Sequence, residues 1–222
     1  MERIAINAYA ERVDGLVLPA SLSRHPVLDF CNTFAGWDGQ ESGDYLRTYD
    51  HLAVWAAAAG LLDPSAAAHL RRRAARHPEE AATSLRRARR FRQDLYAVLT
   101  ASAAQRALAR VAAEVSDAGG AFDLRPAGSA GGAVAAWTPS ARAGLDLPLF
   151  AVARSAADLL VSERARSVRT CPGSGCGWLF LDRSGRRRWC TMATCGNRAK
   201  ARRFAQRNRV PAVVSSRRDR RA

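Results

Sequence analysis

Lysine is almost absent from this chain of 222 residues, because Lys200 is its single copy and arginine dominates the basic side chains. Long apolar runs are missing as well. No stretch reaches the roughly eighteen consecutive apolar residues that a membrane-spanning helix needs, so we expect no membrane partner. Glu2, Glu11 and Asp14 argue against a secretory signal, and we therefore expect a cytoplasmic protein.

The sequence also lacks the motifs by which many enzymes are recognised. It contains no Gly-Lys-Ser or Gly-Lys-Thr phosphate loop, no nucleophile elbow and no paired carboxylates beside a histidine. We therefore predict that the protein is not an enzyme. One alternative stays open, which is an active site around Asp29 and Asn32.

Acidic residues are nearly missing from the last quarter of the chain. Residues 164–222 hold seventeen basic and two acidic side chains, and this difference equals the whole net charge of +15. Residues 1–163 hold eighteen of each sign and are neutral. This division predicts one part that senses a small molecule or dimerises and another part that binds a polyanion.

Cysteine is scarce but clustered. Four of the five cysteines form two pairs, each enclosing four residues, with thirteen residues between the pairs: Cys171, Cys176, Cys190 and Cys195. Two such pairs can complete the tetrahedral thiolate shell that zinc prefers, and a shell of four cysteines leaves no open position for catalysis. We therefore predict a structural Zn²⁺ site. Two disulfides are the alternative, which a reducing compartment disfavours.

The segment around these cysteines has the pattern of a small zinc module. Residues 178–181, 182–185 and 186–189 read as strand, turn and strand, and residues 196–208 read as a helix. A knuckle, a hairpin and a helix at the second cysteine pair resemble a treble-clef zinc finger. We interpret Trp178, Phe180 and Trp189 as packing around the metal, with base stacking as the alternative.

Two stretches of sequence resemble a known family. Residues 190–200 read CTMATCGNRAK, follow CGWLFLD at residues 176–182, and are similar to the CGNR zinc finger of bacterial proteins. Residues 28–33, LDFCNT, resemble the LDFxNT stretch that opens the ABATE domain of the same proteins. The resemblance implies a stress-induced transcription regulator with an N-terminal ABATE domain.

The remaining pattern predicts an α+β fold in which the first domain is mostly helical with a small β-hairpin. We expect an irregular N-terminal arm with a short strand near residues 15–18, a hairpin of residues 122–126 with 133–138, and helices at 45–62, 64–76, 78–102, 104–118 and 147–162. The predicted domains are 1–163, a zinc finger at 164–210 packed against it, and a disordered basic tail at 211–222. The arginines of residues 86–92 are interpreted as a solvated helix face.

Asp29 and Asn32 are three residues apart and would share one face of a helix. They are interpreted either as residues that bind backbone groups or as the lining of a pocket for a small-molecule effector. Cys31 between them is expected to fill the core.

The basic surface of the finger is the predicted nucleic-acid interface. It comprises Arg186, Arg187, Arg188, Asn197, Arg198, Lys200, Arg202, Arg203 and Arg207. Arginine binds phosphate through a planar fork of N–H donors, and we expect Ala201, Phe204 and Ala205 to face the zinc core. Asn197 and Arg198 would read bases if the helix start enters the major groove; alternatively, they hold the finger together.

The predicted function is therefore a DNA-binding transcription regulator. A small-molecule effector and a homodimer, the latter by analogy with symmetric DNA sites, are the further partners expected. An adaptor for RNA or protein that is held together by zinc remains the alternative.

Overall fold

The computed structural model describes residues 1–37, 43–101, 104–127 and 134–208. The helices of the described chain are α1 (Pro26–Cys31), α2 (Tyr49–Ala58), α3 (Pro64–Arg76), α4 (Pro78–Leu99), α5 (Ala104–Ala118), α6 (Leu147–Leu160) and α7 (Asn197–Arg207). The strands form small sheets: β1 (Arg3–Ala5), β2 (Ala10–Val13) and β3 (Leu16–Pro19); β4 (Phe34–Ala35) and β5 (Gly43–Asp44); β6 (Phe122–Pro126) and β7 (Ala135–Pro139); β8 (Val168–Thr170) and β9 (Leu179–Leu181). The predicted α+β class is confirmed.

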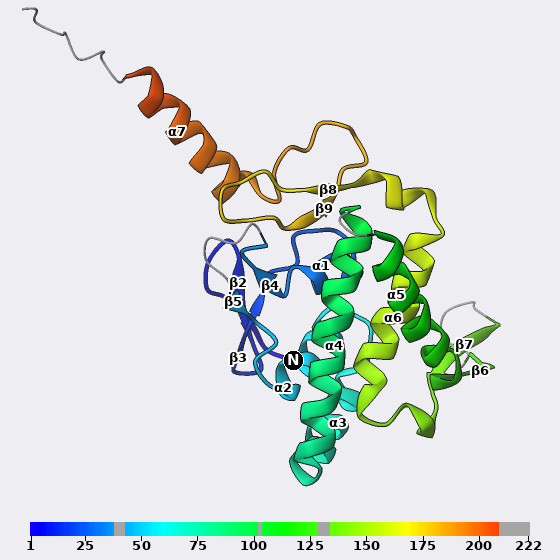
Figure 1. Ribbon diagram of the computed structural model, residues 1–222. Helices are drawn as coiled ribbons and strands as arrows, with labels where there is room; N and C mark the ends of the chain where they lie inside the picture. Colours follow the sequence, from blue (N-terminus) through cyan, green and yellow to red (C-terminus); the bar gives the residue numbers. More distant parts are fainter. Residues whose placement is uncertain (38–42, 102–103, 128–133, 209–222) are drawn as a thin grey trace, which may run out of the picture.

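The helical body is built around α6, which contacts α1, α2, α4 and α5 (Figure 1). Leu149, Val152 and Leu159 of α6 are buried in the main core. Pro64 and Pro78 stand at the starts of α3 and α4, where the missing N–H leaves no helical hydrogen bond unmade. Among the described residues, no helix is both long and apolar enough to cross a membrane.

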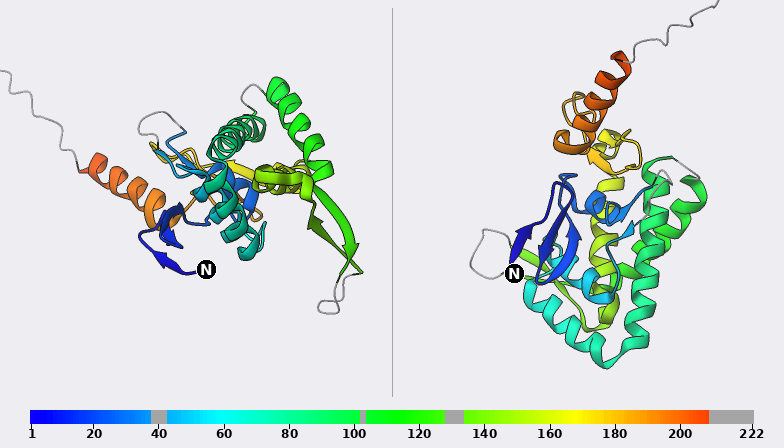
Figure 2. Two further views of the ribbon diagram at one scale, coloured as in Figure 1. Left: turned by 90° about the horizontal axis from the view of Figure 1, so that it is seen from below. Right: turned by 90° about the vertical axis from the view of Figure 1, so that its left-hand side faces the viewer.

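The N-terminal segment is a three-stranded antiparallel sheet rather than an irregular arm, and its strand β3 confirms the short strand predicted near residues 15–18. Asp14 and Gly15, with φ values of 45° and 84°, form the two-residue turn between β2 and β3, in which Val13 pairs with Leu16. Asp-Gly is a strong sequence signal for such a turn because both positions need positive φ. Figure 2 shows this sheet on one side of the body and the β6–β7 hairpin on the other.

Arg92 of α4 corrects the interpretation of a solvated arginine face. Its side chain is 1% exposed and donates to Asp44 Oδ1 and Oδ2 at 2.8 and 2.6 Å. It also donates to Thr33 Oγ1 at 2.8 Å and lies over the ring of Phe34. Because a buried charge must be paired, this ion pair ties α4 to the β4–β5 hairpin.

The strands of the finger pair differently from the prediction. β9 pairs antiparallel with β8, on the other side of the first cysteine pair, and residues 186–189 form no strand. Asp182 Oδ1 accepts hydrogen bonds from the backbone N–H groups of Ser184 and Arg187, each at 3.2 Å. These bonds to a side chain bend the segment into a loop instead of a ladder.

The finger packs on the body instead of hanging from a linker. Asn32 Nδ2 donates to Leu179 O at 2.9 Å, and Leu179 N donates to Asn32 Oδ1 at 2.8 Å. Trp178 Nε1 donates to Phe34 O at 3.0 Å. The prediction that the two parts pack together is confirmed, whereas Arg209 and the predicted tail at 211–222 lie outside the described residues.

Candidate metal centre and its basic helix

The sulfur atoms of Cys171, Cys176, Cys190 and Cys195 all lie within 4.8 Å of one another, and all four residues are buried. The Sγ atoms of Cys176 and Cys190 are 3.6 Å apart, and those of Cys190 and Cys195 are 3.8 Å apart. A tetrahedron with Zn–S bonds of about 2.3 Å places its sulfurs ~3.8 Å apart, whereas a disulfide needs about 2.05 Å. The spacing is that of metal ligands, and all four thiols are free.

The first cysteine pair lies in a tight knuckle between β8 and β9. Cys171 N donates to Trp178 O at 2.8 Å, and Cys176 N donates to Gly173 O at 2.9 Å. A Cβ atom at Gly173 would stand 2.6 Å from Cys195 Sγ, closer than real Cβ atoms come. The knuckle backbone therefore approaches the sulfurs at a place where only glycine fits.

The second cysteine pair is placed by a π-helical turn, Met192–Gly196, that leads directly into α7. Thr191 begins this turn, and its Oγ1 accepts a hydrogen bond from Ala193 N at 3.2 Å. Cys195 lies within the turn, so the last ligand and the start of α7 form one continuous element. A metal bound by Cys195 would therefore fix the position of α7.

Tyr9 reaches this cluster from the N-terminal sheet. Its Oη lies 2.9 Å from Cys195 Sγ, and its ring meets that of Trp178 edge-on at 5.2 Å. Burial raises the pKa of the Tyr9 phenol, so the group stays protonated and is the hydrogen-bond donor to a Cys195 thiolate. No motif pointed to Tyr9, since 186 residues separate it from its partner.

These observations fit a structural zinc ion. Tyr9 adds a hydrogen bond to Cys195 that would stabilise this sulfur as a thiolate, the form in which cysteine binds zinc. Trp178 and Phe180 are 3% and 1% exposed and pack around the sulfurs, so their interpretation as core residues agrees with the structure. Zn²⁺ held by four thiolates would supply folding energy rather than catalysis.

The predicted nucleic-acid residues do not all lie on one free surface. Arg187 is engaged by the fold: its guanidinium lies over the ring of Phe180 and donates to Leu22 O at 2.7 Å and Cys190 O at 2.5 Å. Arg186 and Arg188 are exposed on either side of it. Asn197 Nδ2 donates to Ala193 O at 3.2 Å, in keeping with the alternative that it holds the finger together.

Helix α7 carries the other predicted residues and stands away from the body (Figures 1 and 2). Arg198, Lys200, Arg202, Arg203 and Arg207 are exposed, and within residues 164–208 no described basic side chain forms an ion pair.

The prediction of an apolar face toward the zinc is wrong. Phe204 is 69% exposed, and Ala201 and Ala205 are exposed too. Ala199 alone among the described residues of α7 is buried, because the helix leaves the finger after its first turn.

Asp29 and Asn32 are buried in α1 and bind groups of the chain itself. Asp29 accepts hydrogen bonds from Ser21 Oγ at 2.6 Å and from Ser23 N at 3.0 Å, and Asn32 binds Leu179 as described above. The cavity beside Asp29 measures about 20 Å³, room for about one water molecule. These bonds match the interpretation of both as residues that bind backbone groups, and a ligand pocket at Asp29 and Asn32 stays a prediction. Cys31 is buried as expected.

Comparison with protein families assigns both parts of the chain. The ABATE family, described as "Putative stress-induced transcription regulator", matches residues 24–163, and the CGNR zinc finger family matches residues 167–208. Because the first match covers more than half of the chain, this protein belongs to the ABATE family. It carries a CGNR zinc finger as its second part, and neither family is an enzyme family. No match is found among curated proteins.

The family boundaries agree with the predicted two-part architecture, while the domain limits at 163 and 210 stay predictions. Tyr9 lies outside both matched ranges. Its bond to Cys195 therefore joins the metal cluster to a segment that neither family match covers.

Proposed function

We propose that the protein is a transcription regulator that binds duplex DNA through α7 and the neighbouring loop of its zinc finger. The observation that carries the proposal is the set of unpaired basic side chains on α7. Arg198 and Arg202 are four residues apart and form one ridge, and Lys200, Arg203 and Arg207 form a second. A solvated helix face would usually interleave acidic side chains, and α7 has none.

The dimensions of α7 suit the major groove. Eleven residues make a helix about 16 Å long, and its side chains stand clear of the body from residue 200 onward. The major groove of B-DNA, about 12 Å wide, admits one helix. Arg186 and Arg188, on the exposed loop before Cys190, would contact the phosphate backbone, and Phe204 offers an apolar ring of the kind that meets thymine methyl groups.

The N-terminal domain supplies the regulatory half of the proposal. We assign effector binding or dimerisation to residues 1–163, because this part is neutral and is coupled to the finger through Asn32 and Tyr9. A homodimer would present two copies of α7 to a symmetric DNA site. A DNA-binding regulator of this kind acts in the cytoplasm.

The test is selection from a random duplex library with the zinc-loaded full chain, followed by fluorescence anisotropy on the enriched duplex. We expect a defined motif to be enriched and to bind at least about 10³-fold more tightly than a scrambled duplex at equal salt. Heparin and single-stranded RNA serve as polyanion controls. Equal binding of the selected duplex, RNA and heparin would overturn the assignment, and tighter binding of the RNA than of the other two would favour the RNA adaptor.

A further inference from the structure

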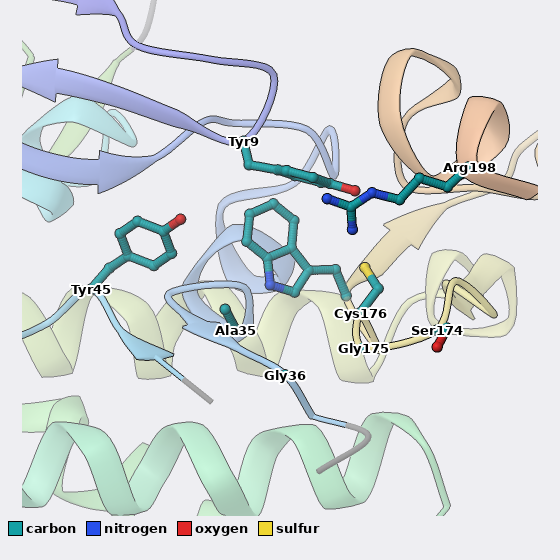
Figure 3. A pocket seen from close by; sticks show the side chains of 9 residues that line it. Tyr9, Ala35, Gly36, Tyr45, Ser174, Gly175, Cys176 and Arg198 are labelled. Atoms are coloured by element: carbon teal, nitrogen blue, oxygen red, sulfur yellow. The ribbon is translucent and has the colours of Figure 1, made fainter. Parts of the chain in front are cut away.

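A cavity of about 530 Å³ lies where the N-terminal sheet, the β4 strand and the zinc finger meet (Figure 3). Three aromatic side chains line it, together with one arginine, one cysteine and small residues: Tyr9, Tyr45, Trp178, Arg198, Cys176, Ala35, Gly36, Ser174 and Gly175. Its volume falls in the range of about 300–1,000 Å³ that is typical of small-molecule sites. This cavity does not include Asp29 or Asn32, for which a ligand pocket was one of the two interpretations of the sequence.

The charges of the lining define which ligand it can hold. None of the described lining residues carries a carboxylate, and the guanidinium of Arg198 makes no hydrogen bond or ion pair with the described part of the chain. Figure 3 shows this guanidinium reaching over the cavity toward Tyr9. A guanidinium without a protein partner offers two parallel N–H donors, for which a carboxylate is the matching acceptor.

The walls define the rest of the ligand. Tyr9 and Trp178 meet edge-on, and Tyr45 faces them across the cavity with its hydroxyl turned toward the same space (Figure 3). Aromatic rings pack on one another by offset or edge-to-face contacts, so a flat ring gains more here than an aliphatic one.

We propose that this cavity binds a small aromatic carboxylate, with Arg198 on the carboxylate and Tyr9, Tyr45 and Trp178 around the ring. This inference extends the proposed function, and its regulatory part rests on the proposal that α7 binds DNA. Because Arg198 also lies at the start of α7, a bound carboxylate neutralises and withdraws a side chain that would otherwise contact DNA. The ligand therefore weakens DNA binding by the same finger.

Binding is tested without DNA by isothermal titration calorimetry of the zinc-loaded full chain. The probes are one-ring and two-ring aromatic carboxylates, led by 4-hydroxybenzoate. Cyclohexanecarboxylate keeps the charge without the flat ring, and 4-hydroxybenzyl alcohol keeps the ring without the charge. We expect at least one aromatic carboxylate to bind about tenfold more tightly than both controls. No binding by any aromatic carboxylate at millimolar concentration, or equal binding of cyclohexanecarboxylate, overturns the proposal.

Matched variants locate the site. Arg198→Gln should weaken binding of the best carboxylate by about tenfold or more, because it removes the charged fork. Arg202→Gln removes the same charge one turn along α7, outside the cavity, and should leave binding within about twofold. Tyr45→Phe should weaken 4-hydroxybenzoate but not benzoate. Equal losses in the two arginine variants, with zinc content unchanged in both, would mean a diffuse charge effect and overturn the site.

A separate titration adds the best carboxylate to the complex of the protein with its selected duplex. Release of DNA from the unaltered chain, and not from the Arg198→Gln variant, is the expected result. If the duplex never binds while the carboxylate does, the DNA proposal fails and the ligand site stands. If DNA binds and no carboxylate binds, the ligand site fails alone.

Discussion

Helices α4 and α7 are both rich in arginine, but arginines of α4 form ion pairs with acidic side chains, whereas the described arginines of α7 do not. In α4, Arg87 pairs with Glu114, Asp117 and Asp146, and Arg92 is buried against Asp44. In α7, no described basic side chain has an acidic partner. The difference lies in the supply of carboxylates, which number eighteen in residues 1–163 and two in residues 164–222. Arginine density alone therefore says little about function, and the local balance of charge says much more.

The largest expected effect comes from removing the metal, because α7 depends on it and α4 does not. Cys190→Ser should abolish zinc binding and DNA binding together, since zinc contributes about 10–16 kcal/mol of apparent free energy to small structural sites. Metal analysis and circular dichroism would report zinc content and helix loss. Cys31→Ala changes the fifth cysteine and should keep the zinc. A Cys190→Ser chain that retains both metal and DNA affinity would contradict the assignment.

The paired arginine of α4 should act on stability alone. Asp44→Asn leaves the Arg92 charge buried without its counter-ion, and we expect the free energy of unfolding to fall by about 3–5 kcal/mol. Asp123→Asn breaks the exposed pair with Arg125 and should cost at most about 1 kcal/mol. Urea unfolding monitored by fluorescence measures both. A drop in DNA affinity of the folded Asp44→Asn variant would break the proposed separation of roles.

Removing the Tyr9 hydroxyl tests the link between the N-terminal sheet and the zinc finger. Tyr9→Phe keeps the ring against Trp178 and removes the hydrogen bond to Cys195, so we expect zinc affinity to fall by about tenfold. Competition with a chromogenic chelator measures this change. Tyr45→Phe removes a hydroxyl that is not bonded to a ligand sulfur in the structure and should leave zinc affinity unchanged. Identical affinities in the Tyr9→Phe and unaltered chains would show that the bond has no influence on the metal.

The unpaired arginines of α7 should contribute to DNA affinity and not to stability, and the effect of changing any one of them should be the smallest in this series. Arg202→Gln should reduce the slope of log affinity against log salt by about one and leave the melting temperature unchanged. Arg106→Gln on the exposed face of α5 removes an equal charge from the helical body and should change neither quantity. Anisotropy titrations at several salt concentrations distinguish them. Equal slopes for Arg202→Gln and the unaltered chain would remove this residue from the interface.

The helices and the metal ligands could be predicted from sequence because their signals are local. Pro64 and Pro78 mark helix starts, apolar residues recur at helical spacing through α4 to α6, and the spacing of the cysteine pairs is typical of zinc sites. Strands β1 and β2 of the N-terminal sheet were missed although Asp14-Gly15 carried a turn signal, because strands of three or four residues have too few positions to show alternation.

The remaining differences between the predictions and the structure depend on contacts between residues that are far apart in the chain. β8 pairs with β9 across the first cysteine pair, and the burial of Arg92 follows from where the β4–β5 hairpin places Asp44. Tyr9 and Cys195 meet only after the whole body has folded. A single sequence carries no signal for such pairs, so the cavity that Tyr9 lines could not be predicted either.

The side chain of Asn32 covers part of a sheet edge at which a strand from another molecule could add. Each strand of a two-stranded ribbon such as β8–β9 has an outer edge with unused peptide groups, and such edges recruit strands from other molecules. Here the amide of Asn32 imitates a peptide unit beside Leu179, and Leu181 N donates to the carbonyl of Ser23 two residues along. The body of the protein therefore occupies the outer edge of β9, where a strand of another molecule could otherwise add.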